Sequence, residues 1–155
     1  MVMGKEVVFV KKSFFCLSEE EIDHMIAEAY NNETHKYRYC LHENENSGMQ
    51  EMIFVQLDDV ISRPHKHPYY AESQMILRGS ALLMLMDEKG DIYERHIVSE
   101  QNNRIWRIDK DIYHVMVPTT PEIVIYEVRE GRFDNGSNFY PSWEKNIKGI
   151  EFLEM

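Results

Sequence analysis

The sequence contains few cysteines, few basic residues and no long apolar run. Its two cysteines, Cys16 and Cys40, form no CxxC pair, so unpaired thiols in a reduced cytoplasm are expected. Only 17 basic residues oppose 27 acidic residues, and the net charge of −10 argues against binding to nucleic acid or anionic lipid. No apolar stretch approaches the roughly 20 residues that span a bilayer, and the N-terminus lacks a signal-peptide pattern. A soluble cytoplasmic protein is therefore predicted. A few local arginines can still bind an anionic small molecule despite the negative net charge.

The 155 residues, of which 43% are hydrophobic, are enough for one domain with a single core. The stretch SEEEIDHMIAEAYNN predicts a short helix, because Ser18 is a suitable N-cap, Glu21 lies three residues later and apolar residues follow at helical spacing. Residues 1–48 are expected to form an N-terminal helix and strand segment that packs on a barrel. Residues 49–155 are expected to form the barrel itself, with an irregular C-terminal tail.

From Met49 onward, short alternating segments predict a mainly β sandwich or small barrel. The expected strands are MQEMIFVQL, VISRPHKH, AESQMILRG, SALLMLMD, DIYERHIVS, NRIWRI, YHVMVP and EIVIYEVRE. The intervening DEKG predicts a hairpin loop with a positive φ at Gly90.

One segment combines histidine and carboxylate at a spacing that suits a metal site. In an extended strand His65 and His67 point the same way, and a second strand begins near Ala71. If the two strands form a hairpin, Glu72 comes opposite the histidine pair, and His114 in YHVMVP adds a third imidazole. These four residues predict a site for one divalent ion, and they do not select among iron, manganese, nickel, cobalt and zinc.

Two further residues are candidates for contact with a ligand. Arg63 shares the parity of the histidines, so it either binds the carboxylate or phosphate of a substrate or pairs with a surface acid. His42 is a candidate pocket residue, with a structural role as the alternative. The sequence names no catalytic residue.

The spacing of the first cluster reproduces a known motif. His65-x-His67, four residues, Glu72, six residues and Gly79 match the first motif of the cupin superfamily. The second cupin motif, Pro-x-Gly-x-x-His, reads DKDIYH in this chain and lacks the glycine. Aspartate tolerates left-handed turn conformations, so the turn is expected to form without it.

A closer resemblance covers most of the chain. The segments RPHKHP, ESQMILRGSALLMLMDEKGDIYERHIV, YHVMVP and IVIYEVREGRFDNGSNFYPSW resemble the WbuC family of small cupin-fold metalloproteins. The resemblance implies a single cupin barrel (jelly roll) with a short N-terminal α-helix, a metal on the four residues above and a link to surface-polysaccharide biosynthesis. Tyr70 departs from the family, which often has lysine there.

Several functions remain open at this point. One is a metalloenzyme acting on a small polar molecule such as a sugar or sugar nucleotide, by isomerase or epimerase chemistry, or as a dioxygenase if the ion is iron. Another is a non-catalytic module that binds or senses a ligand through the metal. A homodimer is expected in either case, since strands such as ALLMLM are apolar on both faces and cupins often dimerise through an outer sheet.

Overall fold

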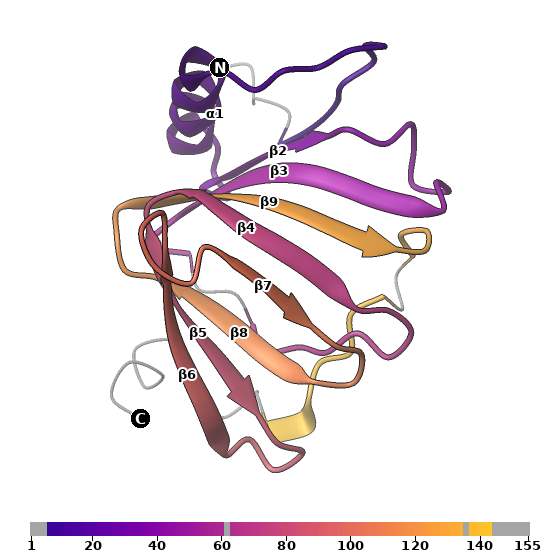
Figure 1. Ribbon diagram of the computed structural model, residues 1–155, viewed down its shortest axis with the longest axis vertical. Helices are drawn as coiled ribbons and strands as arrows, with labels where there is room; N and C mark the ends of the chain where they lie inside the picture. The colour runs from indigo at the N-terminus through magenta and orange to yellow at the C-terminus, as the bar shows by residue number, and fades with distance from the viewer. Residues whose placement is uncertain (1–5, 61–62, 135–136, 144–155) are drawn as a thin grey trace.

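The computed structural model describes residues 6–60, 63–134 and 137–143, which form one α-helix and nine strands (Figure 1). In chain order the elements are β1 (Val7–Phe9), α1 (Glu19–Asn31), β2 (Lys36–Cys40), β3 (Met49–Leu57), β4 (Glu72–Arg78), β5 (Ser80–Met86), β6 (Ile92–Ser99), β7 (Ile105–Ile108), β8 (Tyr113–Pro118) and β9 (Glu122–Glu130). The predicted mainly β fold with one short N-terminal helix is confirmed. No helix in the described part of the chain is long and apolar enough to cross a membrane.

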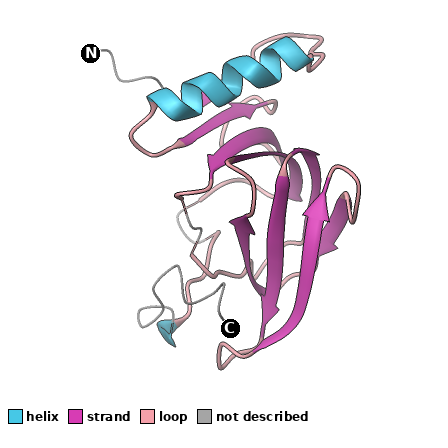
Figure 2. Ribbon diagram, turned by 90° about the vertical axis from the view of Figure 1, so that its left-hand side faces the viewer, coloured by secondary structure: helices cyan, strands magenta, loops and turns pink. Residues whose placement is uncertain are grey.

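The strands form two sheets. The larger has the order β1-β2-β3-β9-β4-β7 and the smaller has the order β6-β5-β8. Neighbouring strands are antiparallel except for β1 and β2, which are parallel. Helix α1 lies beside β2 and β3, away from the three-stranded sheet (Figures 1 and 2).

The helix begins and packs as its sequence predicts. The Ser18 side chain accepts a hydrogen bond from the Glu21 N–H at 3.2 Å, which caps the first turn. Ile22, Met25 and Ala29 are buried against the outer face of the large sheet, where they meet Tyr37, Tyr39, Ile53 and Val55. The expected division of the chain at residue 48 stays a prediction, since β2 and β3 on either side of it pair directly.

The main core lies between the two sheets. Alternate apolar residues of each sheet face one another across it, as in other β sandwiches. The large sheet contributes Ile76, Ile108, Ile123 and Ile125, and the small sheet contributes Ala81, Leu83, Val98 and Met116.

The other face of the small sheet is also covered within the chain. Met84 and Met86 of β5 and Val115 and Val117 of β8 are buried there, and Trp143 packs against them. The apolar character of ALLMLM on both faces is thus largely accounted for by intramolecular packing. The expected homodimer stays a prediction.

The expected strand over residues 60–67 is wrong for the residues that the structure describes, with 61 and 62 lying outside them. The segment pairs only through isolated bridges, His65 with His114 and Lys66 with Phe139. Pro64 and Pro68 flank these two residues, and proline has no N–H with which to continue a ladder. The predicted hairpin with the strand that follows is therefore replaced by a short crossing between β8 and the segment 137–143.

Glycine is required at the turn between β4 and β5. Gly79 has a φ of +88°, and a Cβ built on it would lie 2.4 Å from the Glu122 carbonyl oxygen and 2.7 Å from Thr120 Oγ1. Gly90 in the DEKG hairpin has a φ of +91°, as predicted. Gly79, the last residue of the first cupin motif, therefore has a backbone conformation and a close contact that only glycine accommodates.

Replacing Gly79 with alanine is expected to lower the free energy of unfolding by about 2 kcal/mol or more, because a left-handed φ and a backbone clash both oppose the new Cβ. Gly48→Ala is the matched control, since a Cβ at Gly48 meets nothing within 4 Å. Its effect should stay within about 0.5 kcal/mol. Urea denaturation measures both variants, and an unchanged midpoint for Gly79→Ala would contradict this account.

Candidate metal centre

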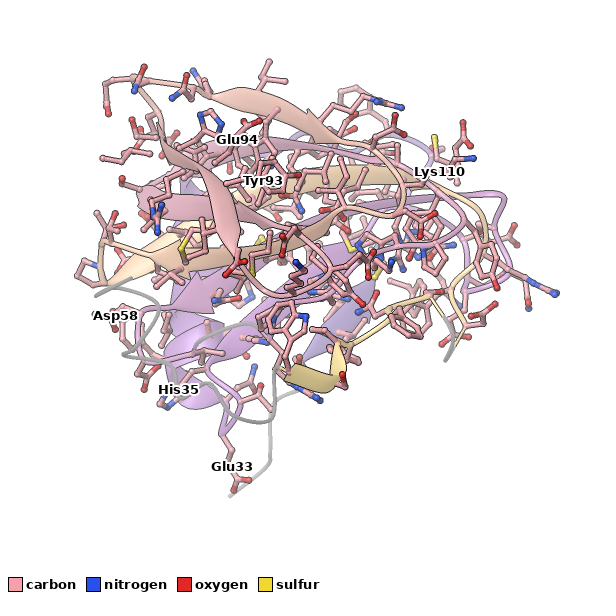
Figure 3. All side chains as sticks on the ribbon, turned by 90° about the horizontal axis from the view of Figure 1, so that it is seen from below. Glu33, His35, Asp58, Tyr93, Glu94 and Lys110 are labelled. Atoms are coloured by element: carbon pink, nitrogen blue, oxygen red, sulfur yellow. The ribbon has the colours of Figure 1, made fainter. Side chains whose placement is uncertain are left out.

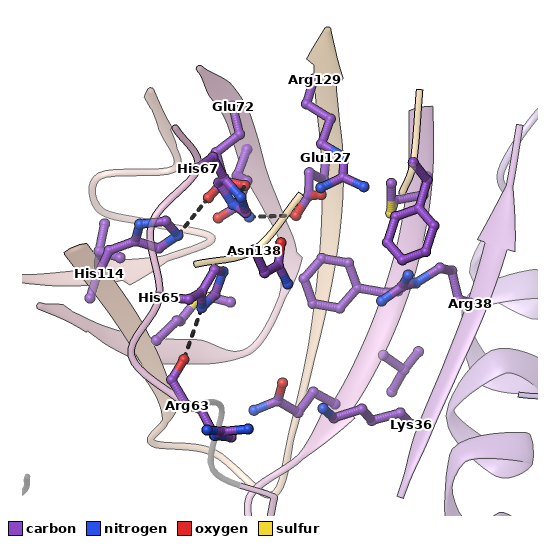
Figure 4. A pocket seen from close by; sticks show the side chains of 18 of the residues that line it. Lys36, Arg38, Arg63, His65, His67, Glu72, His114, Glu127, Arg129 and Asn138 are labelled. Carbon is purple, nitrogen blue, oxygen red and sulfur yellow. Dashed lines mark hydrogen bonds and ion pairs between the residues drawn. The ribbon is translucent and has the colours of Figure 1, made fainter. Parts of the chain in front are cut away.

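The four predicted ligand residues come together between the two sheets (Figure 4). His65 and His67 lie on the irregular segment before β4, Glu72 begins β4 of the large sheet, and His114 lies on β8 of the small sheet. The backbones of His65 and His114 exchange two hydrogen bonds, of 3.1 and 2.9 Å. The segment between Pro64 and Pro68 therefore pairs directly with β8, which places His65 beside His114.

All three imidazoles are oriented by backbone carbonyls. The Nδ1 atoms of His65, His67 and His114 lie 2.8, 2.9 and 2.9 Å from the carbonyl oxygens of Arg63, Ser137 and Ile112. A carbonyl oxygen only accepts, so each Nδ1 must donate, and in its neutral form each ring then carries its lone pair on Nε2. This is the orientation in which histidines bind metals.

The ring nitrogens converge on the carboxylate. One nitrogen from each imidazole lies within 4.8 Å of the others. The Glu72 oxygens lie 3.1 Å from His67 Nε2 and 3.1 Å from His114 Nε2. Among the described residues, however, His67 Nε2 and Glu72 Oε1 are buried without a hydrogen bond of acceptable geometry. Buried polar atoms of this kind call for a partner, and the set of three imidazoles and one carboxylate fits a divalent metal ion.

The charges of the cluster are strongly coupled. Burial raises the pKa of Glu72, but the contacts with His114 and His67 outweigh burial and hold that pKa below its ordinary value. Burial lowers the pKa of His114, yet Glu72 more than compensates and raises it. Burial and the neighbouring His114 lower the pKa of His65 to about 4, so this ring is neutral at physiological pH.

The turn before His114 forms without the glycine of the second cupin motif. Asp111 takes its place in the left-handed region with a φ of +62°. Its N–H donates to the His67 carbonyl oxygen at 3.0 Å. The turn that precedes one ligand is thus tied to the backbone of another.

A cavity of about 220 Å³ opens beside the cluster. Arg63 lines this cavity, and its guanidinium lies 4.2 Å from the ring centroid of Tyr140, which also lines the cavity. Arg63 therefore lies where a ligand in the cavity would meet it. Its contact with a ligand stays a prediction.

Other histidines lie away from the cavity. His42 does not line it in the described part of the chain, because its Nδ1 is engaged with the backbone of Glu51 and its ring packs on the edge of Phe9. His35 contacts Asp59 near the end of β3, on the side of the molecule where Figure 3 shows Glu33 and Asp58. Their local partners support structural roles.

Several charged residues of the cavity were not identified from the sequence: Glu6, Lys36, Arg38, Glu127 and Arg129. Glu127 and Arg129 of β9 line it together with Gln74 of β4. The sequence contained a signal for Glu127 and Arg129. Along β9 they point to the same face as Ile123 and Ile125, which face the core. Charged residues on the core-facing parity of a strand indicate a polar cavity.

Tyr70, the departure from the WbuC pattern, is buried beside the cluster. Its ring stacks on His67 with centroids 4.8 Å apart, and its hydroxyl donates to the Ser137 carbonyl oxygen at 3.0 Å. The same hydroxyl accepts a hydrogen bond from Arg129 Nη1. The cation that a lysine at position 70 would supply is thus present, but it comes from β9.

Comparison with known proteins identifies one sequence family and several similar structures. A family described as Domain of unknown function (DUF6016) matches residues 17–98. No curated protein matches the sequence.

Among solved structures, the chain is similar to the capsular polysaccharide assembling protein CapF from Staphylococcus aureus, solved with the inhibitor 3-isopropenyl-tropolone (TM-score 0.56, 13% identity, 68% of this chain and 31% of CapF). It is also similar to protein SO0799 from Shewanella oneidensis (0.58, 9%, 71% and 76%) and KdgF from Halomonas sp. (0.52, 13%, 64% and 82%). The chain spans about a third of the length of CapF. Identities this low show the fold alone, which is the predicted cupin fold.

Replacing Tyr70 with phenylalanine is expected to lower the free energy of unfolding by about 1–3 kcal/mol, because it removes the only oxygen that Arg129 Nη1 contacts among the described residues. Tyr93→Phe is the control, since Tyr93 is 53% exposed on β6. Chemical denaturation compares the two, and equal effects would show that the Tyr70 hydroxyl contributes nothing to stability.

Proposed function

This chain belongs to the family described as Domain of unknown function (DUF6016), and we propose that it is a metal-dependent enzyme acting on a small polar molecule, most simply a sugar derivative. The observation that carries the proposal is the orientation of the three imidazoles. Each donates Nδ1–H to a backbone carbonyl, so a neutral ring carries its lone pair at Nε2; the ligand nitrogens lie within 4.8 Å of one another, and those of His67 and His114 lie 3.1 Å from the Glu72 carboxylate. A structural network would need no such convergence of lone pairs.

His65, His67, Glu72 and His114 would hold one divalent ion, and iron, manganese, nickel, cobalt and zinc all suit imidazole and carboxylate ligands. When bound, such an ion polarises a carbonyl or hydroxyl oxygen as a Lewis acid. The protein supplies the orientation of the ligands and a cavity that admits one small molecule beside them.

Glu127 favours an enzyme over a purely binding protein. Trp106 Nε1 donates to Gln74 Oε1 at 3.0 Å, and Gln74 Nε2 donates to Glu127 Oε2 at 2.6 Å. Indole nitrogen only donates, so the orientation of the Gln74 amide and the position of the carboxyl are both fixed. Burial and the charge of Glu72 raise the pKa of Glu127, which brings it closer to the range useful for moving protons. In an isomerase or epimerase, this carboxylate would take a proton from a substrate carbon and return it to the same or a neighbouring carbon.

The size of the cavity supports a substrate of monosaccharide dimensions. Its volume of about 220 Å³ lies below the roughly 300–1,000 Å³ of sites for drug-sized ligands. A sugar nucleotide would place its sugar inside and leave its nucleotide outside. The likeness to CapF, a capsular polysaccharide assembling protein, and the resemblance of RPHKHP and YHVMVP to the WbuC family support a role in surface-polysaccharide biosynthesis.

Two further predictions concern the oligomeric state and the cellular location of the protein. A homodimer would use the exposed apolar residues of β6, Tyr93 and Ile97, which are 53% and 59% exposed. A cytoplasmic location follows from the free thiols of Cys16 and Cys40. Light scattering on the purified protein tests the first, and fractionation of the source cells tests the second.

Protein purified without added metal should contain about one divalent ion per chain, and a His65→Ala, His67→Ala double variant should lose it, because two of four ligands are removed. His42→Ala, His96→Ala is the matched control, since these histidines lie outside the cluster. Elemental analysis of all three proteins measures the stoichiometry. Full occupancy in the first double variant would exclude the proposed centre.

Glu127→Gln is expected to retain the metal and to lose turnover by about a hundredfold or more, because the amide cannot take a proton. The measurement is deuterium uptake from D₂O into a panel of aldose and ketose phosphates, followed by NMR. Glu100→Gln, at an exposed position outside the cavity, is the control. If the metal-loaded protein exchanges no carbon-bound hydrogen of any panel member, a binding module is favoured over an isomerase.

A further inference from the structure

Three basic side chains line the cavity from the large sheet, beside the metal ligands. Lys36 and Arg38 project from β2 and Arg129 projects from β9 (Figure 4). In the register of the sheet, Arg129 lies between Gln50 of β3 and Glu72 of β4. Directly paired residues on neighbouring strands have Cβ atoms roughly 5 Å apart. The Arg129 cation is therefore the immediate neighbour of a proposed metal ligand.

Arg129 is held in place by groups that do not neutralise it. Its side chain is 7% exposed, its Nη1 donates to the Tyr70 hydroxyl, and its guanidinium carbon lies 4.9 and 5.4 Å from the ring centroids of Tyr70 and Phe133. Within the described part of the chain, Nε is buried without a partner and no carboxylate lies within 4 Å as an ion pair. Glu72 on β4 and Glu127 on β9 are carboxylates of the same cavity, and the charge of Arg129 opposes the rise in the pKa of Glu127. A buried N–H group without a hydrogen-bond partner is costly, so the Nε donor is available to an anion in the cavity.

The guanidinium of Arg129 has one edge on which an anion would bind. Nη1 is engaged by Tyr70, which leaves the edge formed by Nε and Nη2. Two parallel N–H groups on one edge match the two oxygens of a carboxylate or phosphate. The Tyr70 hydroxyl is itself oriented, because it donates to the Ser137 carbonyl oxygen.

The two cations of β2 line the cavity farther along the sheet, because Arg38 and Lys36 pair with Phe54 and Gln56 of β3 while Arg129 pairs with Gln50. Arg38 lies over the ring of Phe54 at 5.9 Å from its centroid, and Lys36 is partly buried. Neither forms an ion pair with a carboxylate of the described residues, whereas Lys66 and Arg78 elsewhere in the chain do. Glu6, Glu72 and Glu127 also line the cavity, so the positive charge is confined to the places where these basic side chains lie.

We propose that the Arg129 side of the cavity is an anion subsite, which binds the carboxylate or phosphate of the ligand while the rest of the ligand faces the histidine cluster. Arg129 forms a bidentate pair with the anion, and Arg38 and Lys36 add long-range attraction. The ligand is therefore an acidic or phosphorylated small molecule, and a neutral sugar is a poor one. The position of the remainder of the ligand rests on the proposed function, but the anion subsite does not.

The test compares three sugars that share the same pyranose ring by calorimetric titration at low ionic strength. Glucose 6-phosphate and glucuronate are the charged probes and glucose is the neutral one. At least one charged probe should bind about tenfold more tightly than glucose or better, and its affinity should fall as sodium chloride is added. A preference for the phosphate or for the carboxylate identifies which oxyanion the subsite takes. Equal affinity for all three sugars, or no binding of either charged one, would overturn the inference.

Variants then locate the anion. Arg129→Met should weaken binding of the charged probe by about tenfold or more, because the paired N–H donors are lost. Arg104→Met is the matched control at an exposed position outside the cavity and should bind as the unaltered protein does. Because Arg129 is buried, Arg129→Lys, which keeps the charge but loses the paired N–H donors, provides a second variant that decides the question if Arg129→Met does not fold. Undiminished affinity in the folded variants would overturn the subsite.

The double variant His65→Ala, His67→Ala separates this inference from the proposed metal centre. If charged sugars still bind to it and binding still depends on Arg129, the subsite stands without the metal. If they bind only to the metal-loaded protein and Arg129→Met leaves that binding unchanged, the anion is held by the metal and the subsite is refuted. Elemental analysis of the same samples reports the metal independently, so either proposal can fail alone.

Discussion

The hydrogen bonds from three imidazole Nδ1 atoms to backbone carbonyl oxygens decide what this protein can do. Rotating any of these neutral rings would turn its lone pair out of the cluster and leave a donor there, which no cation could use. Two of the carbonyls lie two residues before their own histidine, so that part of the arrangement is local. The third belongs to Ser137, seventy residues after His67, and depends on the complete fold. The centre is thus a product of the backbone more than of the histidine side chains alone.

Much of the fold and the ligand set could be predicted because both depend on local patterns. The period of apolar residues predicted the helix and most strands, and the spacing of His65, His67, Glu72 and Gly79 predicted a cluster whose side chains the structure brings together. The hairpin proposed for this cluster was wrong because alternation alone does not reveal the pairing partner. Pro64 and Pro68 already indicated that no long ladder could form between them.

The other residues of the cavity could not be predicted from residue spacing, because they lie on strands that are distant in the sequence. Arg129, Gln50 and Glu72 become neighbours only when β9 lies between β3 and β4. A single strand shows that Glu127 and Arg129 share the core-facing parity, but not which polar groups they meet. The cation that contacts the Tyr70 hydroxyl likewise comes from another strand, β9. The polar groups of the cavity are therefore distributed over the sheet.

The segment 137–143 has a consequence for the order in which the molecule is made. Its Ser137 carbonyl orients His67 and Tyr70, its Phe139 pairs with Lys66, and its Trp143 packs on the turn at Gly90. During synthesis the ribosome releases His65 and His67 long before this segment emerges. The growing chain therefore exposes these histidines before the contacts that orient them can form. The cluster reaches its final geometry only after the residues up to 143 have emerged.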